Sequence, residues 1–541
     1  MRRLRWFVAA LVVTGCGDRG SVTFDLTAPQ SPLFNPVVQP ELVTEYDIRT
    51  ASGSVIGIAS AVQSSGSSSN GLLPLGALMP AGDPEDVYVT ALSGGNLLGM
   101  ARIKDVTIKP GKKASYEAPL RKPLMFVGSA LPPEMAGGNK TAAVQVLDPL
   151  TSEDLARASG TPVNLTALTA AASTWDGRFV VVAQGSSLSA FDTGTGKMVA
   201  GTLALTFAPS RLVVAPRDQA IVALDPGSGA DGGMAILSDV AGFVGSPGGG
   251  NPKVVRMPGA IARTAAFSPD GSKLYVLTGG MSVDPCAPGA TLSANAIQVY
   301  GLDGTMTGTL ALEGFAADIT VDPQTGAIVI ADVAGKQVAT LDPTSGAPTK
   351  LLGNLTCPSA VRVVNGTVYA VTSDRDPSSA NAFVLQRVPL KGGSPTATPF
   401  GGAFFNIPID STPSSNGDVG MATLPVRPTS IDAYELAITP DGSRAEFATR
   451  AVYNEQGTKF TFSQEDCTAT FDIVEYGLFA VDLRTGNASY QQRSQLVQMP
   501  AMGSMCVDCK FTILGSTQHQ YADCPSTAGD RPAGLAATFG Q

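Results

Sequence analysis

The segment 506–524, CVDCKFTILGSTQHQYADC, gathers the residue types in this chain that could do chemistry. It contains Cys506, Cys509 and Cys524, together with His519, which is the only histidine among 541 residues. Three cysteines and a histidine are suitable ligands for a tetrahedral zinc ion. Two cysteines separated by two residues also have the spacing of a redox-active pair. The third possibility is that these cysteines form structural disulfides.

The other cysteines help to choose between these possibilities. Apart from Cys16 the chain has six cysteines, of which those outside this segment are Cys286, Cys357 and Cys467. A zinc site in 506–524 would leave these as an odd set, whereas disulfides can use all six. A redox pair needs a helix N-terminus that lowers a thiol pKa, and no helical pattern precedes Cys506. We therefore expect disulfides and keep the zinc site as the alternative.

The first sixteen residues, MRRLRWFVAALVVTGC, indicate how the chain reaches its compartment. Arginines precede an apolar run from Trp6 to Val13, which is typical of a secretory signal and too short to remain as a membrane-spanning helix. The residues Val13 to Cys16 resemble the bacterial lipobox, whose cysteine is diacylated and becomes the new N-terminus. The resemblance implies a signal peptide at 1–15, lipid attachment at Cys16 and a lipidated tether at 16–20. A signal peptide followed by an unmodified cysteine is the alternative.

Acyl chains at Cys16 would anchor the protein to a membrane of the bacterial cell envelope, since each buried CH₂ contributes about 0.8 kcal/mol. In lipoproteins of bacteria with two membranes, an aspartate directly after the lipidated cysteine tends to retain the protein in the inner membrane. Here that position is Gly17, and Asp18 is one residue further on. The resemblance therefore favours the outer membrane.

Composition and charge indicate an exported all-β protein. The chain has 36 Lys plus Arg against 45 Asp plus Glu, so nucleic acid is not an expected partner. Only 15% of residues are charged, while Gly and Pro number 60 and 39, which makes the chain rich in turns. Residues 21–119 contain short runs of alternating apolar and polar residues, such as SVTFDLTA and DVYVTALSG, broken by Gly, Ser and Pro. This pattern predicts a β-sandwich, similar to Ig-like or transthyretin-like modules.

From about residue 120 onward a repeated pattern predicts the fold. Its first part is a strand end, a tight turn and a second apolar strand, as in FSPDGSKLYVLTGG (267–280) and ITPDGSRAEFATR (438–450). Its second part is a turn such as AFDTGTGK (190–197) or TLDPTSGA (340–347). The spacing fits four strands per propeller blade plus loop insertions. The pattern resembles the bacterial PDG-repeat propellers of the YVTN and lactonase-like group over residues 120–541, a group that includes binding scaffolds, enzymes and envelope proteins.

The repeat also predicts how the ring closes. The first blade, which begins with LMFVGSA (124–130), lacks the strand that precedes the pattern elsewhere, and RPAGLAATFG (531–540) resembles such a strand. We therefore expect the C-terminal strand to complete blade one of an approximately seven-bladed propeller, which removes both exposed sheet edges. The other blades are expected to begin near residues 164, 209, 260, 315, 358 and 430.

The predicted blades place the long insertions on one face of the propeller, because they follow the second strand of a blade or connect two blades. These insertions are 131–141, 225–232, 279–294, 401–429, 451–475 and 499–530. Six cysteines allow fifteen pairings, and sequence alone does not select one. From the positions of the blades we favour Cys286 with Cys357, and Cys467 with a cysteine of 506–524, where the remaining two also pair.

Two classes of function remain open. The single histidine and the lack of a catalytic motif favour a non-catalytic scaffold that binds a protein or a glycan on the face with the insertions. The alternative is a hydrolase or lactonase-like enzyme with a carboxylate-bound metal in the central channel. Asp225 and Asp231 could bind calcium, but they lack the alternating carboxylates of an EF-hand, so a Gly-rich turn is preferred. No catalytic residue and no cofactor other than the covalent lipid at Cys16 is predicted.

Overall fold

The computed structural model describes residues 19–39, 42–51, 53–60, 74–130, 142–151, 153–158, 163–165, 168–228, 231–279, 286, 292, 294–374, 379–400, 406–413, 419–425, 430–453, 459–462, 467–470, 472–498 and 531–539. The chain forms two compact units, Met1–Lys122 and Pro123–Gln541. Within the described ranges, no helix is long and apolar enough to cross a membrane.

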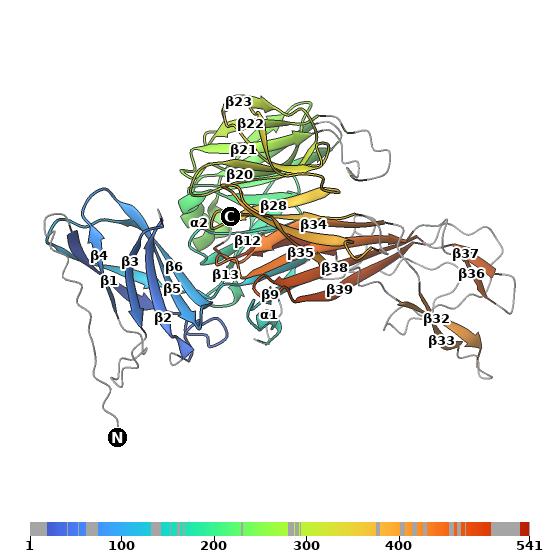
Figure 1. The fold of residues 1–541 in the computed structure, drawn as a ribbon, viewed down its shortest axis with the longest axis horizontal. Helices are drawn as coiled ribbons and strands as arrows, with labels where there is room; N and C mark the ends of the chain where they lie inside the picture. The colour runs from blue at the N-terminus through green and yellow to red at the C-terminus, as the bar shows by residue number, and fades with distance from the viewer. Residues whose placement is uncertain are drawn as a thin grey trace, which may run out of the picture. The chain divides into compact units, whose positions relative to one another are not determined.

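The N-terminal unit is the predicted β-sandwich, drawn in blue in Figure 1. One sheet has the order β4–β1–β7, in which β1 runs parallel to β7, and the other is antiparallel with the order β3–β2–β5–β6. The strands are β1 (Arg19–Thr27), β2 (Glu45–Thr50), β3 (Val55–Ser60), β4 (Leu75–Pro80), β5 (Glu85–Ser93), β6 (Asn96–Val106) and β7 (Lys113–Pro119).

Alternating residues of both sheets form the core of the sandwich. Val22 and Phe24 of β1 meet Ile48 of β2 and Val87 and Val89 of β5, and all five are fully buried. The strand β4 was not predicted from the sequence, because its alternation of apolar and polar residues is short. The alternating run DVTIKPGK (105–112) also has the pattern of a strand, but it does not form a separate one, because its first residues continue β6 to Val106 and the following residues lead into β7.

The second unit is a β-propeller. Within the described residues it contains seven four-stranded antiparallel sheets, one of which has the additional short strand β15. The first strands of consecutive sheets contact one another in the closed order β40, β11, β16, β20, β24, β28, β34 and back to β40. These seven strands are therefore the innermost strands and surround the propeller axis. The fold class predicted from the repeat is confirmed.

The strand bounds, from the innermost strand outward, follow the predicted repeat. Blades 1 to 3 contain β40 (Arg531–Ala537), β8 (Met125–Ala130), β9 (Ala142–Leu147), β10 (Val163–Leu165); β11 (Leu168–Ser173), β12 (Phe179–Gln184), β13 (Ser187–Asp192), β14 (Lys197–Met198), with β15 (Leu203–Ala204); and β16 (Arg211–Val214), β17 (Ile221–Ser228), β18 (Asp231–Leu237), β19 (Lys253–Met257). Blades 4 and 5 contain β20 (Ile261–Phe267), β21 (Lys273–Gly279), β22 (Ala296–Gly301), β23 (Met306–Ala311); and β24 (Ala316–Val321), β25 (Ile328–Asp332), β26 (Gln337–Leu341), β27 (Pro348–Leu352). Blades 6 and 7 contain β28 (Pro358–Val364), β29 (Thr367–Thr372), β30 (Phe383–Pro389), β31 (Thr396–Phe400); and β34 (Ser430–Ile438), β35 (Arg444–Tyr453), β38 (Asp472–Asp482), β39 (Ala488–Gln498).

Short helical segments lie between some of these strands. They are α1 (Leu155–Ala158), η3 (Pro216–Asp218), α2 (Val240–Gly245) and η4 (Pro247–Gly249). Apolar side chains of neighbouring sheets pack against each other. For example, Ile297 of blade 4 belongs to the same buried cluster as Ile319 and Ile330 of blade 5. The blades are therefore held together mainly by burial of apolar surface between sheets.

The C-terminal strand closes the ring as predicted. β40 pairs antiparallel with β8, so that one sheet contains both ends of the propeller unit. Beyond the strand, the Thr538 backbone N–H donates to the Leu124 carbonyl at 2.9 Å, and Leu124 N–H donates to Thr538 Oγ1 at 2.7 Å. Phe539 is 1% exposed, and a Cβ added to Gly177 of blade 2 would lie 2.6 Å from its ring. Closure therefore joins blade 1 to blade 2 by close packing as well as by strand pairing.

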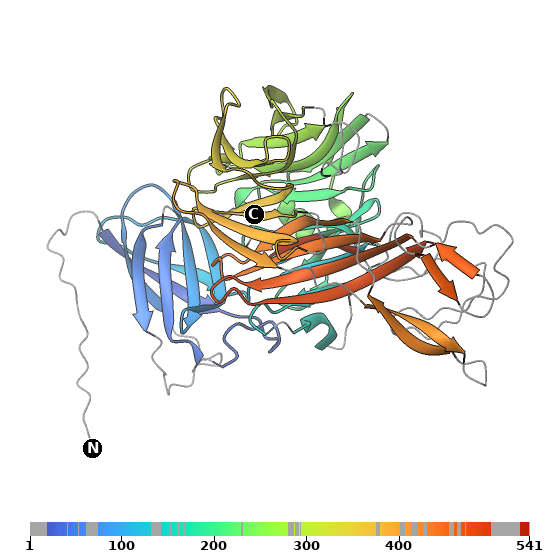
Figure 2. The same cartoon turned by 45° about the vertical axis from the view of Figure 1, so that its right-hand side comes forward.

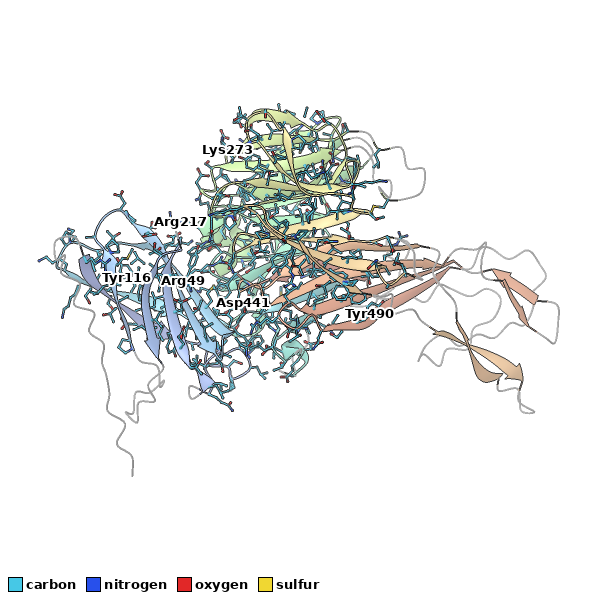
Figure 3. All side chains as sticks on the ribbon, in the orientation of Figure 1. Arg49, Tyr116, Arg217, Lys273, Asp441 and Tyr490 are labelled. Carbon is cyan, nitrogen blue, oxygen red and sulfur yellow. A yellow bond between two sulfur atoms is a disulfide. The ribbon has the colours of Figure 1, made fainter. Side chains whose placement is uncertain are left out.

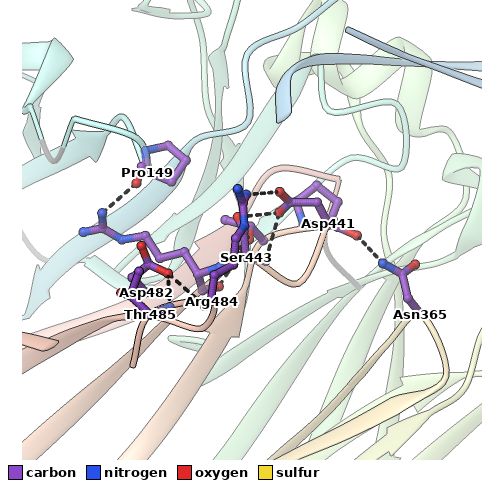
Figure 4. A network of polar contacts seen from close by, with 10 residues as sticks. Pro149, Asn365, Asp441, Ser443, Asp482, Arg484 and Thr485 are labelled. Atoms are coloured by element: carbon purple, nitrogen blue, oxygen red, sulfur yellow. Dashed lines mark hydrogen bonds and ion pairs between the residues drawn. The ribbon is translucent and has the colours of Figure 1, made fainter. Parts of the chain in front are cut away.

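One face of the propeller carries the short turns between the first and second strands of blades 2 to 7. Arg217 and Asp441 belong to two such turns and Lys273 directly follows a third, and all three lie on the same side of the propeller in Figure 3. Figure 4 shows how the turn of blade 7 reaches both neighbours. Asn365 Nδ2 of blade 6 donates to the Pro440 carbonyl at 3.1 Å, and Arg444 of blade 7 donates to the Pro149 carbonyl at 2.6 Å.

The opposite face, here called the decorated face, is where the innermost strands begin. Because the strands of a blade are antiparallel, the loop after each second strand and the connection to the next blade leave from this face. Two of these segments carry hairpins, formed by β32 (Asn406–Pro413) with β33 (Val419–Pro425) and by β36 (Lys459–Phe462) with β37 (Cys467–Thr470). In blade 7 the long strands β35 and β38 run side by side in both Figure 1 and Figure 2.

The segment 225–232 differs from its expected role as an insertion. β17 continues to Ser228 and β18 begins at Asp231, and Ser228 pairs with Asp231, so the two strands form a long hairpin. The pairing of the two strands is interrupted between Asp225 and Ser228. Glycine at 227, with a φ of 74°, supplies the left-handed conformation that the turn needs.

Candidate binding site at the decorated end of the propeller axis

Five charged side chains are described on the innermost strands, and we call them the axial charged cluster. They are Arg211, Arg263, Asp318, Arg362 and Glu435. Arg211, Arg263 and Asp318 occur in the first halves of their strands, which begin at the decorated face, whereas Arg362 and Glu435 lie just past the middle of β28 and β34. Charged side chains are rare inside otherwise apolar strands unless they are paired. The partners of each residue therefore indicate what the cluster can do.

Arg211 and Glu435 form an ion pair across the propeller axis. The Arg211 guanidinium is 3.2 Å from Glu435 Oε1, and the two side chains are 27% and 10% exposed. Their strands, β16 and β34, are not neighbours in the ring, because β11 and β40 lie between them. The other carboxylate oxygen, Oε2, accepts a hydrogen bond from the Leu535 backbone N–H at 2.9 Å. Glu435 thus links blades 3, 7 and 1.

Asp318 joins blades 4, 5 and 6 in a similar way. Its Oδ2 accepts from Arg362 at 2.6 Å and from the Val361 backbone N–H at 3.0 Å. Its Oδ1 accepts from the Ile319 backbone N–H at 3.0 Å and from Thr264 Oγ1 at 3.3 Å. The Asp318 side chain is only 4% exposed, and four donors satisfy its charge. This carboxylate is therefore occupied by structural contacts.

Arg263 is different, because its guanidinium faces an aromatic ring and no carboxylate among the described residues. The guanidinium carbon lies 4.8 Å from the centre of the Phe315 ring. Its buried Nε has no hydrogen-bond partner among the described residues. Burial lowers the pKa of the Arg263 guanidinium, and the positive charge of Arg211 lowers it further. Two like charges on neighbouring strands, β16 and β20, are thus held close to each other.

Neighbouring groups hold Arg263 and Phe315 in place. A Cβ added to Gly279 would lie 3.1 Å from the Arg263 Cδ, so the end of β21 packs directly on the arginine stem. Asn295 is 5% exposed and binds both backbone groups of Ala316, which directly follows Phe315. Since Gly279 precedes the insertion that contains Cys286, the guanidinium is placed at the decorated end of blade 4.

The structure contains the disulfide between Cys286 and Cys357, with a Cα–Cα distance of 5.6 Å. This is the pairing that the positions of the blades favoured. Cys286 belongs to the loop after the second strand of blade 4, and Cys357 immediately precedes the innermost strand of blade 6. The bond therefore spans blade 5 on the decorated face and closes a sequence separation of 71 residues.

The other sequence-predicted site residues are placed only in part. Cys467 is the first residue of β37, and its pairing partner stays a prediction. Outside the described residues lie Cys16, Cys506, Cys509, His519 and Cys524, and with them the predicted lipid attachment and the zinc alternative.

The two aspartates considered for calcium bind backbone groups of turns. Asp225 Oδ1 accepts from the Gly227 N–H at 2.9 Å, and Asp231 Oδ1 accepts from the Gly259 N–H at 2.9 Å. These contacts agree with the preferred reading of a Gly-rich turn. Within the described part of the chain, no three His, Cys, Asp or Glu side chains gather in a group that could hold a metal ion.

The axial charged cluster is not among the sites predicted from the sequence, although the sequence contains a signal for it. The innermost strands of blades 2 to 7 each precede a recognisable turn, and a charged residue inside such a strand stands out, as Arg263 does in IARTAAFSPDG and Glu435 does in SIDAYELAITPDG. The similar spacing to the turn places both at about the same level along the axis. It does not reveal which charges are paired, because the partners are more than 40 residues apart in the chain.

Comparisons with known proteins bear on the fold alone. No protein-family model matches the chain, and no curated protein matches it by sequence. Among solved structures, it is similar to a 6-phosphogluconolactonase-like protein of Bacteroides fragilis, with 12% identity, a TM-score of 0.42, and coverage of 77% of this chain and 98% of that chain. It is also similar to the dihydro-heme d1 dehydrogenase NirN in complex with DHE, with 12% identity, a TM-score of 0.37, and coverage of 69% and 74%.

A third similar structure is the hydrazine synthase of Kuenenia stuttgartiensis, with 12% identity, a TM-score of 0.31, and coverage of 65% of this chain and 90% of that chain. All three scores are low, so the assignment of this chain to the β-propellers rests on its strand pairing. The class that the fold defines is a two-unit all-β protein, in which a sandwich precedes a seven-bladed propeller closed by its C-terminal strand.

Proposed function

We propose that this protein is a lipid-anchored lipoprotein of the bacterial cell envelope, in the outer membrane, whose PDG-repeat propeller is a non-catalytic scaffold. Its ligand is a protein or a glycan that binds the decorated face. The observation that carries the proposal is that the decorated face bears the Cys286–Cys357 disulfide and the hairpins β32–β33 and β36–β37. The opposite face carries the turns between first and second strands and the connections that contain α1 and α2.

The axial charged cluster supports the non-catalytic part of the proposal. A carboxylate that acts as a general base or metal ligand must be available to substrate or metal. Asp318 and Glu435 are instead engaged by arginines and backbone N–H groups. The Arg211–Glu435 pair also places side chains across the axis, where an axial substrate site would need space.

The short tether supports a role close to the membrane. β1 begins at Arg19, three residues after Cys16. An extended chain covers at most about 3.6 Å per residue. Acyl chains on Cys16 would therefore hold the sandwich within about 10 Å of the membrane surface. In this proposal the sandwich follows the lipid anchor in the chain, and the decorated face of the propeller binds the ligand.

Membrane fractionation tests the anchor. Wild type and Cys16→Ala are expressed in a bacterium with two membranes, and the N-terminal peptide of each is examined by mass spectrometry. We expect an acylated peptide and outer-membrane fractionation for wild type only. An unmodified Cys16, or the same membrane association of Cys16→Ala, would contradict the anchor.

Capture of a ligand tests the scaffold. The full chain carrying Cys16→Ser is immobilised and exposed to envelope extract and to a glycan array. We expect a specific protein or glycan to be retained and to be lost after reduction of the disulfide. The same preparation is assayed for hydrolysis of lactones, with and without added divalent metal. Turnover abolished by Asp318→Asn or Glu435→Gln would contradict the non-catalytic reading.

A further inference from the structure

The axial charged cluster has more positive than negative charge. Its three arginines face two carboxylates, and both carboxylates are already bound on each oxygen. Arg362 is paired with Asp318, and Arg211 is paired with Glu435 through one of its nitrogens. Arg263 has neither a carboxylate nor a hydrogen-bond acceptor among the described residues. Among the described side chains, one positive charge of the cluster thus lacks a counter-charge.

We propose that Arg263, together with Arg211, binds an oxyanion group of the ligand at the decorated end of the propeller axis. The inference rests on the proposed scaffold function and specifies the chemistry of the group that the scaffold recognises. Guanidinium groups bind carboxylates, sulfates and phosphates through parallel N–H donors. The shared chemistry is that of an oxyanion, which a uronate, a sulfated sugar or a phosphate ester can supply.

The surroundings of Arg263 suit recognition of an anion. The Phe315 ring covers one side of the guanidinium, and its 6% exposure shows that this contact is largely shielded from water. Stacking on a ring leaves the N–H groups at the edge of the guanidinium available for an acceptor in its plane. The positive charge of Arg211 disfavours the charged form of Arg263, and the Arg211 guanidinium would bind the same anion as Arg263. An anion at this point would relieve the repulsion between the two arginines.

Direct binding measurements test the site. The full chain carrying Cys16→Ser is titrated by calorimetry with sodium sulfate, sodium phosphate and sodium glucuronate, each against sodium chloride at the same ionic strength. We expect one probe to bind with one-to-one stoichiometry, and the preferred probe indicates which source supplies the oxyanion. Arg263→Gln should weaken that binding about tenfold or more, since a hydrogen bond between charged groups is lost.

Two variants complete the test. Arg178 also stacks on a phenylalanine, Phe179, at 5.7 Å, but it is exposed and lies on a turn of the opposite face. Arg178→Gln therefore removes the same charge and the same kind of contact, and it should bind the probe as wild type does. Glu435→Gln removes the competing carboxylate of Arg211 and should bind the probe more tightly.

Several outcomes would overturn the inference. They are equal binding by wild type and Arg263→Gln, equal weakening by Arg178→Gln, or binding of no probe above the chloride control. If Arg263→Gln does not fold, Arg263→Lys keeps the charge but not the planar donors, and an affinity equal to that of wild type would count against the site.

The scaffold and the anion site can fail separately. Ligand capture that Arg263→Gln leaves unchanged would refute the anion site and leave the scaffold standing. Probe binding without capture of any envelope component would refute the scaffold and leave the anion site.

Discussion

Arg211 and Glu435 are 224 residues apart in the chain, from 435 − 211, yet their side chains meet at 3.2 Å across the propeller axis. Their strands, β16 and β34, are not neighbours in the ring. The ion pair can therefore form only when the ring is closed and has its native dimensions. Removing one partner of a largely buried ion pair leaves the other charge without compensation.

We expect Glu435→Ala to lower the free energy of unfolding by about 2–4 kcal/mol, because it leaves the Arg211 charge and the Leu535 N–H without their acceptor. Urea denaturation followed by circular dichroism measures the effect. The double variant Arg211→Met with Glu435→Leu should recover a large part of the loss, since it removes both charges. Glu313→Ala, at an exposed position, is the control and should change the stability by less than about 0.5 kcal/mol. A cost of Glu435→Ala no greater than that of the control would show that the pair is not formed.

The disulfide between Cys286 and Cys357 is expected to stabilise the propeller. In the chain-entropy model, closing a sequence separation of 71 residues contributes on the order of 4 kcal/mol. The double variant Cys286→Ser with Cys357→Ser should therefore unfold at a lower guanidinium concentration than oxidised wild type. Reduced wild type serves as the comparison, because it lacks the bond but keeps the sequence at these positions. Identical midpoints for oxidised wild type and the variant would contradict a stabilising role.

Ring closure depends on Phe539, which follows the C-terminal strand and is 1% exposed. Phe539→Ala should cost about 3–4 kcal/mol, because it empties a well-packed position between blades 1 and 2. Gly177→Ala should also destabilise, since its φ is 67° and its Cβ would meet the Phe539 ring. Met306→Ala, at a side chain that is 54% exposed, is the matched control. Thermal unfolding that is the same for Phe539→Ala and the control would show that the C-terminus does not hold the ring.

The turn of blade 4 makes stability depend on pH. Hydrogen bonds from Ser268 and Ser272 lower the pKa of the Asp270 carboxyl below its unfolded value of about 3.9. A group whose folded pKa is lowered contributes stability above the unfolded pKa and loses it as pH falls through the folded pKa. The difference in unfolding free energy between wild type and Asp270→Asn should therefore be largest near pH 6–7 and shrink below about pH 4.

Denaturant titrations at pH 7, 5, 4 and 3 check this prediction. The effect should be modest because Asp270 is exposed and water competes with its partners. Ser268→Ala removes the hydroxyl that donates to Asp270 Oδ1 at 2.6 Å, and it should reduce the same pH-dependent difference. A difference that grows toward low pH would have the wrong sign and contradict the assignment.

The amino-acid sequence by itself determined the architecture of this protein. Alternating residues predict strands, Asp-Gly and Asn-Gly pairs predict the turns between them, and the recurrence of both predicts blades. These signals are local, which is why the expected blade starts near 209, 260 and 358 agree with Arg211, Ile261 and Pro358. The closing strand was also predictable, since blade one lacks an innermost strand and Arg531–Ala537 has the pattern of one.

Only the tertiary structure decided which charges meet. In the sequence, Arg211, Arg263 and Glu435 are isolated charges in apolar strands. Their spacing does not indicate that Arg211 pairs with Glu435. That pairing depends on the number of blades, because the curvature of the ring determines which innermost strands face each other across the axis. Among the described residues, Arg263 has no carboxylate partner for the same reason, since Asp318 and Glu435 are bound by other residues.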